Sequence, residues 1–362
     1  MASTGAAHDA REAQRAAVRT IPPKANADVR RERKHEGAAV KAALAANIGV
    51  ALAKLAAFAF TRSSSMLSES VHSIADCSNE IVLLAGGRLS KHRYNTVHPF
   101  GWYRVKYLAS FVVATLLFFV GGFFSSSEAI KKVIDVCGNP AARAANRGEL
   151  VVALIVVIIS ACLEGYGLHQ SIKEANERME HTGMPHMGIY RFWRVTKSAD
   201  LASVIMEDTL ALIGLAFAFL GIGAAIVCND ELYDALGGLG VGVVLIIGSL
   251  LLAYKVGSLL IGESASDLTQ SRIIDAVEGT EGVEELINMQ TVHMSEDNIL
   301  LCLKVQTSKL DRDYDVDTIN KIEDSVRSAM PWFNWEIYVE PDIYNPAKAH
   351  GPAQFEDPDD DE

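Results

Sequence analysis

The sequence predicts an α-helical membrane protein, with six transmembrane helices followed by a small cytosolic α+β domain. Apolar residues gather into several runs of membrane-spanning length before Gly262, whereas residues 263–362 are polar and acidic. Hydrophobic residues make up 49% of the 362 residues, which excludes an intrinsically disordered chain. Five cysteines in so long a chain exclude a disulfide scaffold.

Six stretches are long and apolar enough to cross a bilayer, whose core needs about 20 mostly apolar residues in a helix. They are Ala42–Phe60, Met66–Leu89, Tyr107–Phe124, a run that begins near Leu150, Leu201–Ile226 and Leu236–Ile261. The second stretch is the most polar, and by itself it has the composition of a surface helix. Its neighbours, which are clear spans, favour a membrane helix there as well.

Lysine and arginine residues in the short loops predict the orientation, because they are enriched on the cytosolic side. Nineteen precede the first span or lie in the loops after the second and fourth spans, against five on the other side. We therefore expect both termini in the cytosol. We expect the protein itself to lie in the plasma membrane or in an organelle membrane. We expect residues 1–37 to be a disordered tail; a mitochondrial targeting segment is the alternative, against which their acidic residues argue.

After Gly262 the pattern becomes that of a small folded domain. Residues 271–286 have the pattern of a helix ending at a glycine turn, residues 287–295 and 298–308 that of two strands, Val316–Met330 that of a second helix, and Trp335–Val339 that of a third strand. We therefore expect a transmembrane domain over 38–262, an αββαβ domain over 263–344 and a disordered acidic tail over 345–362.

The charge is as uneven as the hydropathy. Residues 263–362 carry 7 Lys and Arg against 24 Asp and Glu, a net charge of −17, whereas residues 1–262 carry a net charge of +5. An acidic soluble segment repels phosphate groups, so the charge argues against a nucleic acid partner.

Polar residues inside the second span are functional candidates, because each charged group there costs about 2.5–3.5 kcal/mol on insertion. The span holds Glu69, His72, Asp76 and Glu80. His72 and Asp76 are four residues apart, so they lie one turn apart on one helical face. An imidazole and a carboxylate at this spacing can share one divalent cation. A buried ion pair or a proton relay without metal fits the spacing equally well.

The fifth span carries two adjacent acidic residues, Glu207 and Asp208, well inside the membrane, and Asp200 near its start. Successive residues of a helix differ by about 100° in direction, so at least one of the deep pair faces the bundle interior. Neither carboxylate stays charged alone in a low dielectric, so the pair indicates a bound cation or a proton. A purely structural role needs a cationic partner, such as Lys54 in the first span.

Two other acidic residues, Glu128 and Glu164, lie near the ends of the third and fourth spans. We expect them to reach interfacial water. The chain has no Walker A, GxSxG or HExxH motif, so nothing indicates an ATP-driven pump or an intramembrane hydrolase. We expect no enzymatic activity and no cofactor.

Several motifs resemble those of the cation diffusion facilitators, in the branch related to zinc transporter nine. They are SESVHSIADCSNEIVLL, HPFGWYRVKYLASFVVATLLFFVGG, EGYGLHQSIKEA, VIMEDTLALIGLAFAFLGI, LLIGE and IYVEPD, in the order and spacing of the family. The resemblance covers about residues 38–344. It implies export of Zn²⁺ or a similar divalent metal from the cytosol, usually in exchange for protons, by a homodimer in the lipid bilayer.

The resemblance also implies the metal ligands: His72 and Asp76 in the second span and Asp208 in the fifth. The family pattern offers a further His or Asp four residues before Asp208, where this chain has Val204. Glu207, Asp200 or a water molecule can complete a tetrahedral site. An oxygen-rich site accepts Mn²⁺ or Fe²⁺ more readily than a site with two histidines.

Two other classes of function fit the same residues. In the first, a membrane sensor or scaffold binds metal but does not transport it, and the departure at Val204 is its support. In the second, an intramembrane metalloenzyme uses Glu207 as a general base and keeps an open coordination position on its metal. The sequence names no substrate for such an enzyme.

Overall fold

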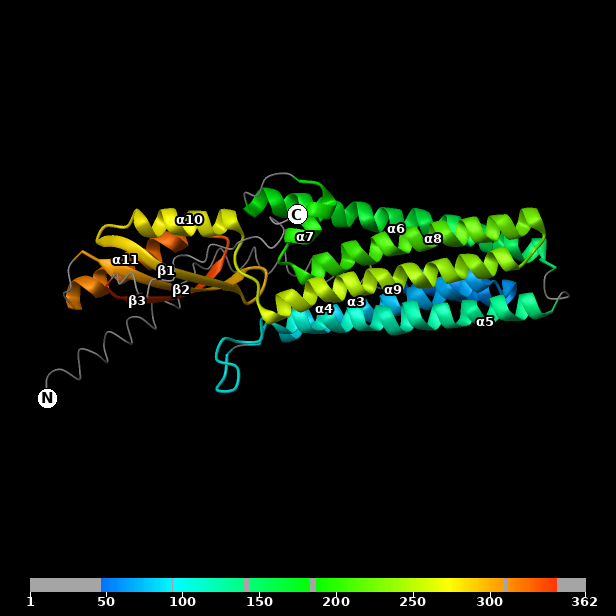
Figure 1. Cartoon of the computed structure of the whole chain (residues 1–362), viewed down its shortest axis with the longest axis horizontal. Helices are drawn as coiled ribbons and strands as arrows, with labels where there is room; N and C mark the ends of the chain where they lie inside the picture. Colours follow the sequence, from blue (N-terminus) through cyan, green and yellow to red (C-terminus); the bar gives the residue numbers. More distant parts are fainter. Residues whose placement is uncertain (1–46, 93, 140–143, 183–186, 309–311, 344–362) are drawn as a thin grey trace. The chain divides into compact units, whose positions relative to one another are not determined.

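The computed structural model describes residues 47–343, except for residue 93 and the segments 140–143, 183–186 and 309–311. The two expected tails, residues 1–37 and 345–362, lie outside the described residues, as does the beginning of the first expected span. The described part consists of long helices and a small domain that contains a β-sheet (Figure 1).

Four helices are long and apolar enough to cross a membrane. They are Val105–Gly138, Arg147–Glu180, Ala199–Cys228 and Leu232–Ile261. They contain the third, fourth, fifth and sixth spans that the sequence predicts. The first and second expected spans are also helical, but the helix Asn47–Thr61 is short in its described part and α3 (Ser64–Leu89) is too polar for the same standard. Six spans therefore remain a prediction.

The helix at the third span is longer than the expected Tyr107–Phe124. It consists of α4 (Val105–Leu116), the wide-wound π-helical segment η1 (Leu117–Phe124) and α5 (Ser125–Gly138). The sequence expectation ended where the apolar run ends, but the helix continues because α5 is amphipathic and buries Ala129 and Val136 on one side.

The next three long helices are α6 (Arg147–Thr182), α8 (Ala199–Cys228) and α9 (Leu232–Ile261). A short helix, α7 (Ile189–Val195), interrupts the connection between α6 and α8, where the sequence predicts only a loop. Its residue Phe192 is fully buried in a cluster with Met179 and Ile205. The loop after the fourth span is therefore partly folded onto the helices.

Glycine residues allow α8 and α9 to pack backbone against backbone. A Cβ atom on Gly221 would lie 2.7 Å from the Cα of Gly237 and 2.8 Å from the carbonyl oxygen of Tyr233. α9 also approaches α5, since a Cβ atom on Gly242 would lie 2.7 Å from the backbone nitrogen of Ser126. Such close contacts are the usual way for membrane helices to gain packing energy, because lipid offers no hydrophobic driving force between helices.

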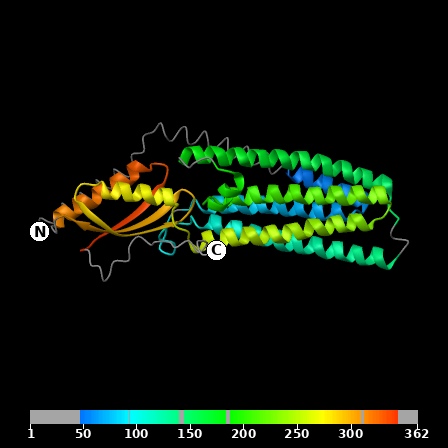
Figure 2. The ribbon, with the colours of Figure 1, turned by 45° about the horizontal axis from the view of Figure 1, so that its top comes forward.

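The C-terminal domain consists of α10 (Asp267–Glu278), β1 (Val283–His293), β2 (Asn298–Thr307), α11 (Arg312–Ala329) and β3 (Asn334–Pro341). The sheet has the order β1-β2-β3, with β1 and β2 antiparallel and β2 and β3 parallel. Both helices lie on the same face of the sheet (Figure 2). Leu301, Ile322 and Trp335 are part of the core between them.

The αββαβ order agrees with the order that the sequence predicts. The boundary of the first helix differs, because α10 ends at Glu278 and residues 283–286, which the sequence assigns to the helix, begin β1. The turn between them contains Gly282, whose φ of +100° is one that glycine adopts easily. The sequence thus predicted a glycine turn at the end of this helix, but the turn comes before residues 283–286 and not after them.

Candidate metal centre

The polar residues of α3 lie along one side of the helix, as the sequence predicts. The Nδ1 atom of His72 is 3.5 Å from an Oδ1 atom of Asp76 one turn later. His72 is fully buried, and neither of its ring nitrogens has a hydrogen-bond partner among the described residues. An imidazole buried without a hydrogen bond is costly, so these two nitrogens are available for a ligand.

The two acidic residues of α8 point toward different helices. The side-chain amide of Asn79, on α3, donates a hydrogen bond of 3.0 Å to Glu207. The hydroxyl group of Ser171, on α6, donates one of 2.8 Å to Asp208. Glu207 therefore faces the helix that carries His72, whereas Asp208 faces α6.

Lys54 does not neutralise either acid of α8, although the sequence offered it as their partner. Its ammonium group is completely buried and lies 3.2 Å from an oxygen of Glu69 and 3.5 Å from an oxygen of Glu164. Glu164 was expected to reach interfacial water. Instead it lies within α6 and pairs with this buried lysine. Glu128 is more exposed, and it pairs with Lys131.

The four predicted metal ligands, His72, Asp76, Glu207 and Asp208, are not gathered into one cluster. Among the described residues, no three His, Cys, Asp or Glu side chains lie close enough together to hold a metal ion. Asp200, which we considered as a substitute for the ligand missing at Val204, lies 3.6 Å from Lys106 at the start of α4. In the described arrangement His72 and Asp76 lie next to each other on α3. The two acids of α8 are instead hydrogen-bonded to Asn79 and Ser171.

Residues 40–261 match the sequence model of the cation efflux transmembrane domain. The chain belongs to the cation efflux family. This match confirms the resemblance of its motifs to the cation diffusion facilitators, and together with the four apolar helices it identifies an integral membrane protein.

Curated relatives align with about two thirds of this chain. The chain is 28% identical over 241 residues to the mitochondrial proton-coupled zinc antiporter of Xenopus laevis and 25% identical over 241 residues to that of Homo sapiens. These alignments cover 67% of this chain but only 41% and 40% of the relatives. The chain is 24% identical over 257 residues to metal tolerance protein C4 of Arabidopsis thaliana, which covers 71% of this chain and 54% of that relative.

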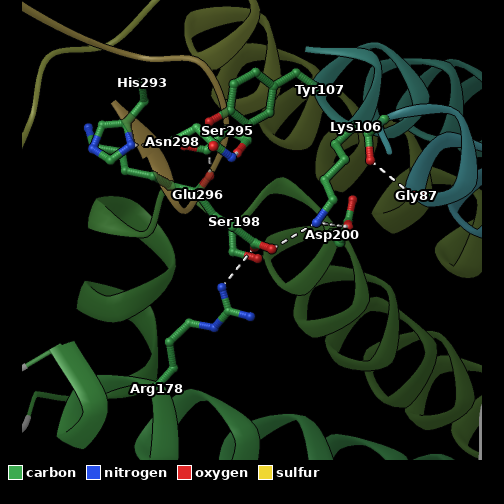
Figure 3. A network of polar contacts seen from close by, with 12 residues as sticks. Gly87, Lys106, Tyr107, Arg178, Ser198, Asp200, His293, Ser295, Glu296 and Asn298 are labelled. Atoms are coloured by element: carbon green, nitrogen blue, oxygen red, sulfur yellow. Dashed lines mark hydrogen bonds and ion pairs between the residues drawn. The ribbon is translucent and has the colours of Figure 1, made fainter. Parts of the chain in front are cut away.

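A second polar network of this cation efflux protein lies at the beginnings of α4 and α8 and near the end of α6 (Figure 3). Glu296, between β1 and β2, accepts hydrogen bonds from Lys106 at 2.8 Å and from Arg178 at 2.7 Å. Burial by itself raises the pKa of the Glu296 carboxyl. The charges of Arg178 and Lys106, with hydrogen bonds from Lys106 and Ser198, outweigh burial and lower this pKa to about 2. Glu296 is therefore ionised at neutral pH.

Some partners in these sites could be predicted from the sequence, and others could not. Asn79 follows Asp76 by three residues, so helical spacing alone places it on the same stripe. Ser171, Glu296 and Arg178 lie in other elements, and nothing in a single sequence says which elements face each other. These contacts with α8 and with the helix ends were therefore missed.

Proposed function

We propose that this protein transports a divalent metal cation, with Zn²⁺ as the preferred substrate, out of the cytosol in exchange for protons. The observation that carries the proposal is the buried His72–Asp76 pair on α3, whose imidazole has no hydrogen-bond partner among the described residues. The names of the two animal relatives, both proton-coupled zinc antiporters, support the choice of metal and of coupling.

In this proposal His72, Asp76 and Asp208 bind the metal, and Glu207 is the further ligand in place of the residue missing at Val204. All of these side chains must be deprotonated to coordinate a metal, so metal binding releases protons and protonation favours metal release. Exchange of metal for protons follows directly from this competition.

Metal binding in this scheme requires α8 to move relative to α3 and α6. The hydrogen bonds Asn79–Glu207 and Ser171–Asp208 hold the two acids apart, so at least the second must break before both carboxylates can reach one ion. Each such bond contributes about 0.5–1.5 kcal/mol, and bonds to charged groups about 1.5–3 kcal/mol. A coordinated divalent cation can offset that loss.

The remaining parts of the proposal concern topology and assembly. We propose six transmembrane helices, both termini in the cytosol and a homodimer formed through the αββαβ domain. The excess of Lys and Arg in the loops that we assign to the cytosol supports the orientation. Molar mass by light scattering tests the dimer, and a monomer at micromolar concentration would contradict it.

The decisive test is metal flux into proteoliposomes under an imposed pH gradient, with Zn²⁺, Mn²⁺, Fe²⁺ and Co²⁺ compared. We expect Zn²⁺ flux that depends on the gradient and disappears in Asp76→Ala. Flux of another metal in place of Zn²⁺ would change the proposed substrate but would still support a metal transporter. Flux that is independent of the gradient would exclude proton exchange.

A metal-binding membrane sensor or scaffold is the second candidate. Two observations favour it: Val204 stands where the family pattern has a ligand, and the described ligands form no cluster. In the same experiment, tight binding of metal without flux would support the sensor and exclude the transporter.

A further inference from the structure

The most unusual buried group in the membrane helices is the ammonium group of Lys54. It is fully buried and lies between two carboxylates, with Nζ 3.2 Å from Glu69 Oε2 and 3.5 Å from Glu164 Oε1. Removing an ion from water costs several kcal/mol even after relaxation, so a lysine stays in such a place only when it is well paired. The three residues, which we call the Lys54 triad, carry one positive and two negative charges.

The Lys54 triad joins several helices at one point. Lys54 belongs to the helix Asn47–Thr61, Glu69 to α3 and Glu164 to α6. The second oxygen of Glu69 faces α8, because a Cβ atom on Gly214 would lie 3.1 Å from it. That oxygen has no hydrogen-bond partner among the described residues. One carboxylate oxygen of the triad, on Glu69, therefore remains able to accept a further interaction while Lys54 is in place.

The Lys54 triad is next to the proposed metal ligands. Glu69 precedes His72 by three residues, so the two side chains lie on the same side of α3, one turn apart. Lys54 is close enough for its charge to act on both His72 and Asp76. A fixed positive charge so near opposes a divalent cation, and the low dielectric strengthens this effect.

We propose that the Lys54 ammonium is an internal competitor of the transported cation, which neutralises Glu69 and Glu164 while the site is empty and weakens metal binding at His72 and Asp76. This inference rests on the proposed function. A transporter must bind its ion well enough to load it but weakly enough to release it, as conduction pathways do. Without the ammonium, the carboxylates of Glu69 and Glu164 would be uncompensated and would favour retention of a divalent metal. Lys54 is a positioning residue, since it acts through the carboxylates it holds.

The test is the double variant Lys54→Met/Glu69→Gln, which preserves the charge of the triad. The wild-type triad has a net charge of −1, and the variant keeps −1 on Glu164 alone. A purely structural role, or a role of net charge alone, predicts an unchanged metal affinity. The inference predicts that the equilibrium Kd for Zn²⁺ falls at least about tenfold, because the ammonium is gone and the Glu164 carboxylate is released. The turnover number in proteoliposomes should fall with it, because the metal leaves slowly.

Metal binding is measured in detergent at pH 8 by competition with a chelating dye, so the readout does not depend on transport. An unchanged or higher Kd would overturn the inference. Lys54→Arg keeps the positive charge and should leave Kd close to that of the wild type; a fall as large as that of the double variant would also overturn it. Wild-type protein that binds Zn²⁺ but gives no flux would refute the proposed function alone, since the affinities can still be compared.

A second variant covers the case in which the double variant does not fold. Glu164→Gln keeps the Lys54–Glu69 pair and removes one negative charge from beside it. The inference predicts that Kd rises about tenfold, because the ammonium is then opposed by a single carboxylate. A Kd equal to that of the wild type in a monodisperse Glu164→Gln protein would overturn the inference.

Discussion

Asn79 donates a hydrogen bond of 3.0 Å from its side-chain amide to the carboxylate of Glu207, and so connects α8 to the metal-binding face of α3. Asn79 lies one turn beyond Asp76 on the same helix. The bond therefore directs Glu207, the residue that we propose as the substitute for the ligand missing at Val204, toward His72 and Asp76.

Removing this bond should weaken metal binding without unfolding the protein. We expect Asn79→Ala to raise the Kd for Zn²⁺ about fivefold, since a hydrogen bond of this kind contributes about 1 kcal/mol. Ser78→Ala is a suitable control, because Ser78 is the neighbouring residue and its hydroxyl group donates to the carbonyl oxygen of Ile74 in its own helix. Equal affinities in the two variants would show that the direction of Glu207 does not matter.

Asp208 should be essential for transport. Asp208→Asn keeps the size of the side chain but removes the charge that a divalent metal needs. We expect flux to fall more than about 100-fold, because even the residues that support a metal ligand typically cost 10–100-fold when they are replaced. Thermal stability should stay close to that of the wild type. Ser171→Ala keeps the Asp208 carboxylate and removes the hydroxyl group that bonds to Asp208 and to the Gly167 carbonyl, so it should lower flux less than Asp208→Asn does. Transport by Asp208→Asn would rule out this ligand.

The contact between α8 and α9 should be intolerant of a single added methyl group. Gly221→Ala places a Cβ atom 2.7 Å from the Cα of Gly237, and backbone atoms cannot move aside easily. We expect the free energy of unfolding to fall by about 1–3 kcal/mol, the usual cost of overpacking a close contact. Gly223 is the matched control two residues later, since a Cβ atom there would meet nothing within 4 Å. A melting temperature that is lowered equally by both substitutions would contradict the packing argument.

The ion pairs of Glu296 should stabilise the protein only above mildly acidic pH. The pKa of Glu296 is lowered from 4.5 to about 2, so its contribution is complete above pH 4.5 and is lost as the pH falls toward 2. A shift of that size corresponds to roughly 3 kcal/mol at neutral pH. Glu296→Gln should therefore lower the melting temperature at pH 7, and its difference from the wild type should shrink below pH 4.5.

The comparison must be made by difference, because another group in the same network titrates nearby. Burial lowers the pKa of His293 from 6.5 to about 4, so both proteins lose stability as the pH falls from 6.5 toward 4. Glu281→Gln is the surface control, since the Glu281 side chain is 88% exposed. Its effect should stay below about 0.5 kcal/mol at every pH. A difference between wild type and Glu296→Gln that grows on acidification would refute the assignment.

Spacing within one helix was enough to predict the pairing of His72 with Asp76, because residues four apart are always one turn apart. The same rule could not say which helix Glu207 and Asp208 face, since that depends on how separate helices pack. Lys54 shows the limit most clearly. Its charge was recognised as a partner for buried acids, but the acids it meets are Glu69 and Glu164.

The ends of the elements were predicted less well than their order. The apolar run ends at Phe124, yet the helix continues to Gly138 because α5 is amphipathic and one apolar face is enough to pack it against its neighbours. α7 was missed because seven residues are too few to show a clear helical period. The β1 strand begins inside a run of acids that also suits a helix, and pairing with β2 decides its structure.

The wide-wound segment Leu117–Phe124 sets the rotation of everything that follows it in the same helix. Beyond it, α5 turns Ser126 toward the backbone of Gly242, where a Cβ atom would come within 2.7 Å of the Ser126 nitrogen. Deleting one residue from the segment would turn Ser126 by about 100° and aim a different side chain at that narrow gap. This part of the chain can therefore exchange one apolar residue for another more readily than it can change its length.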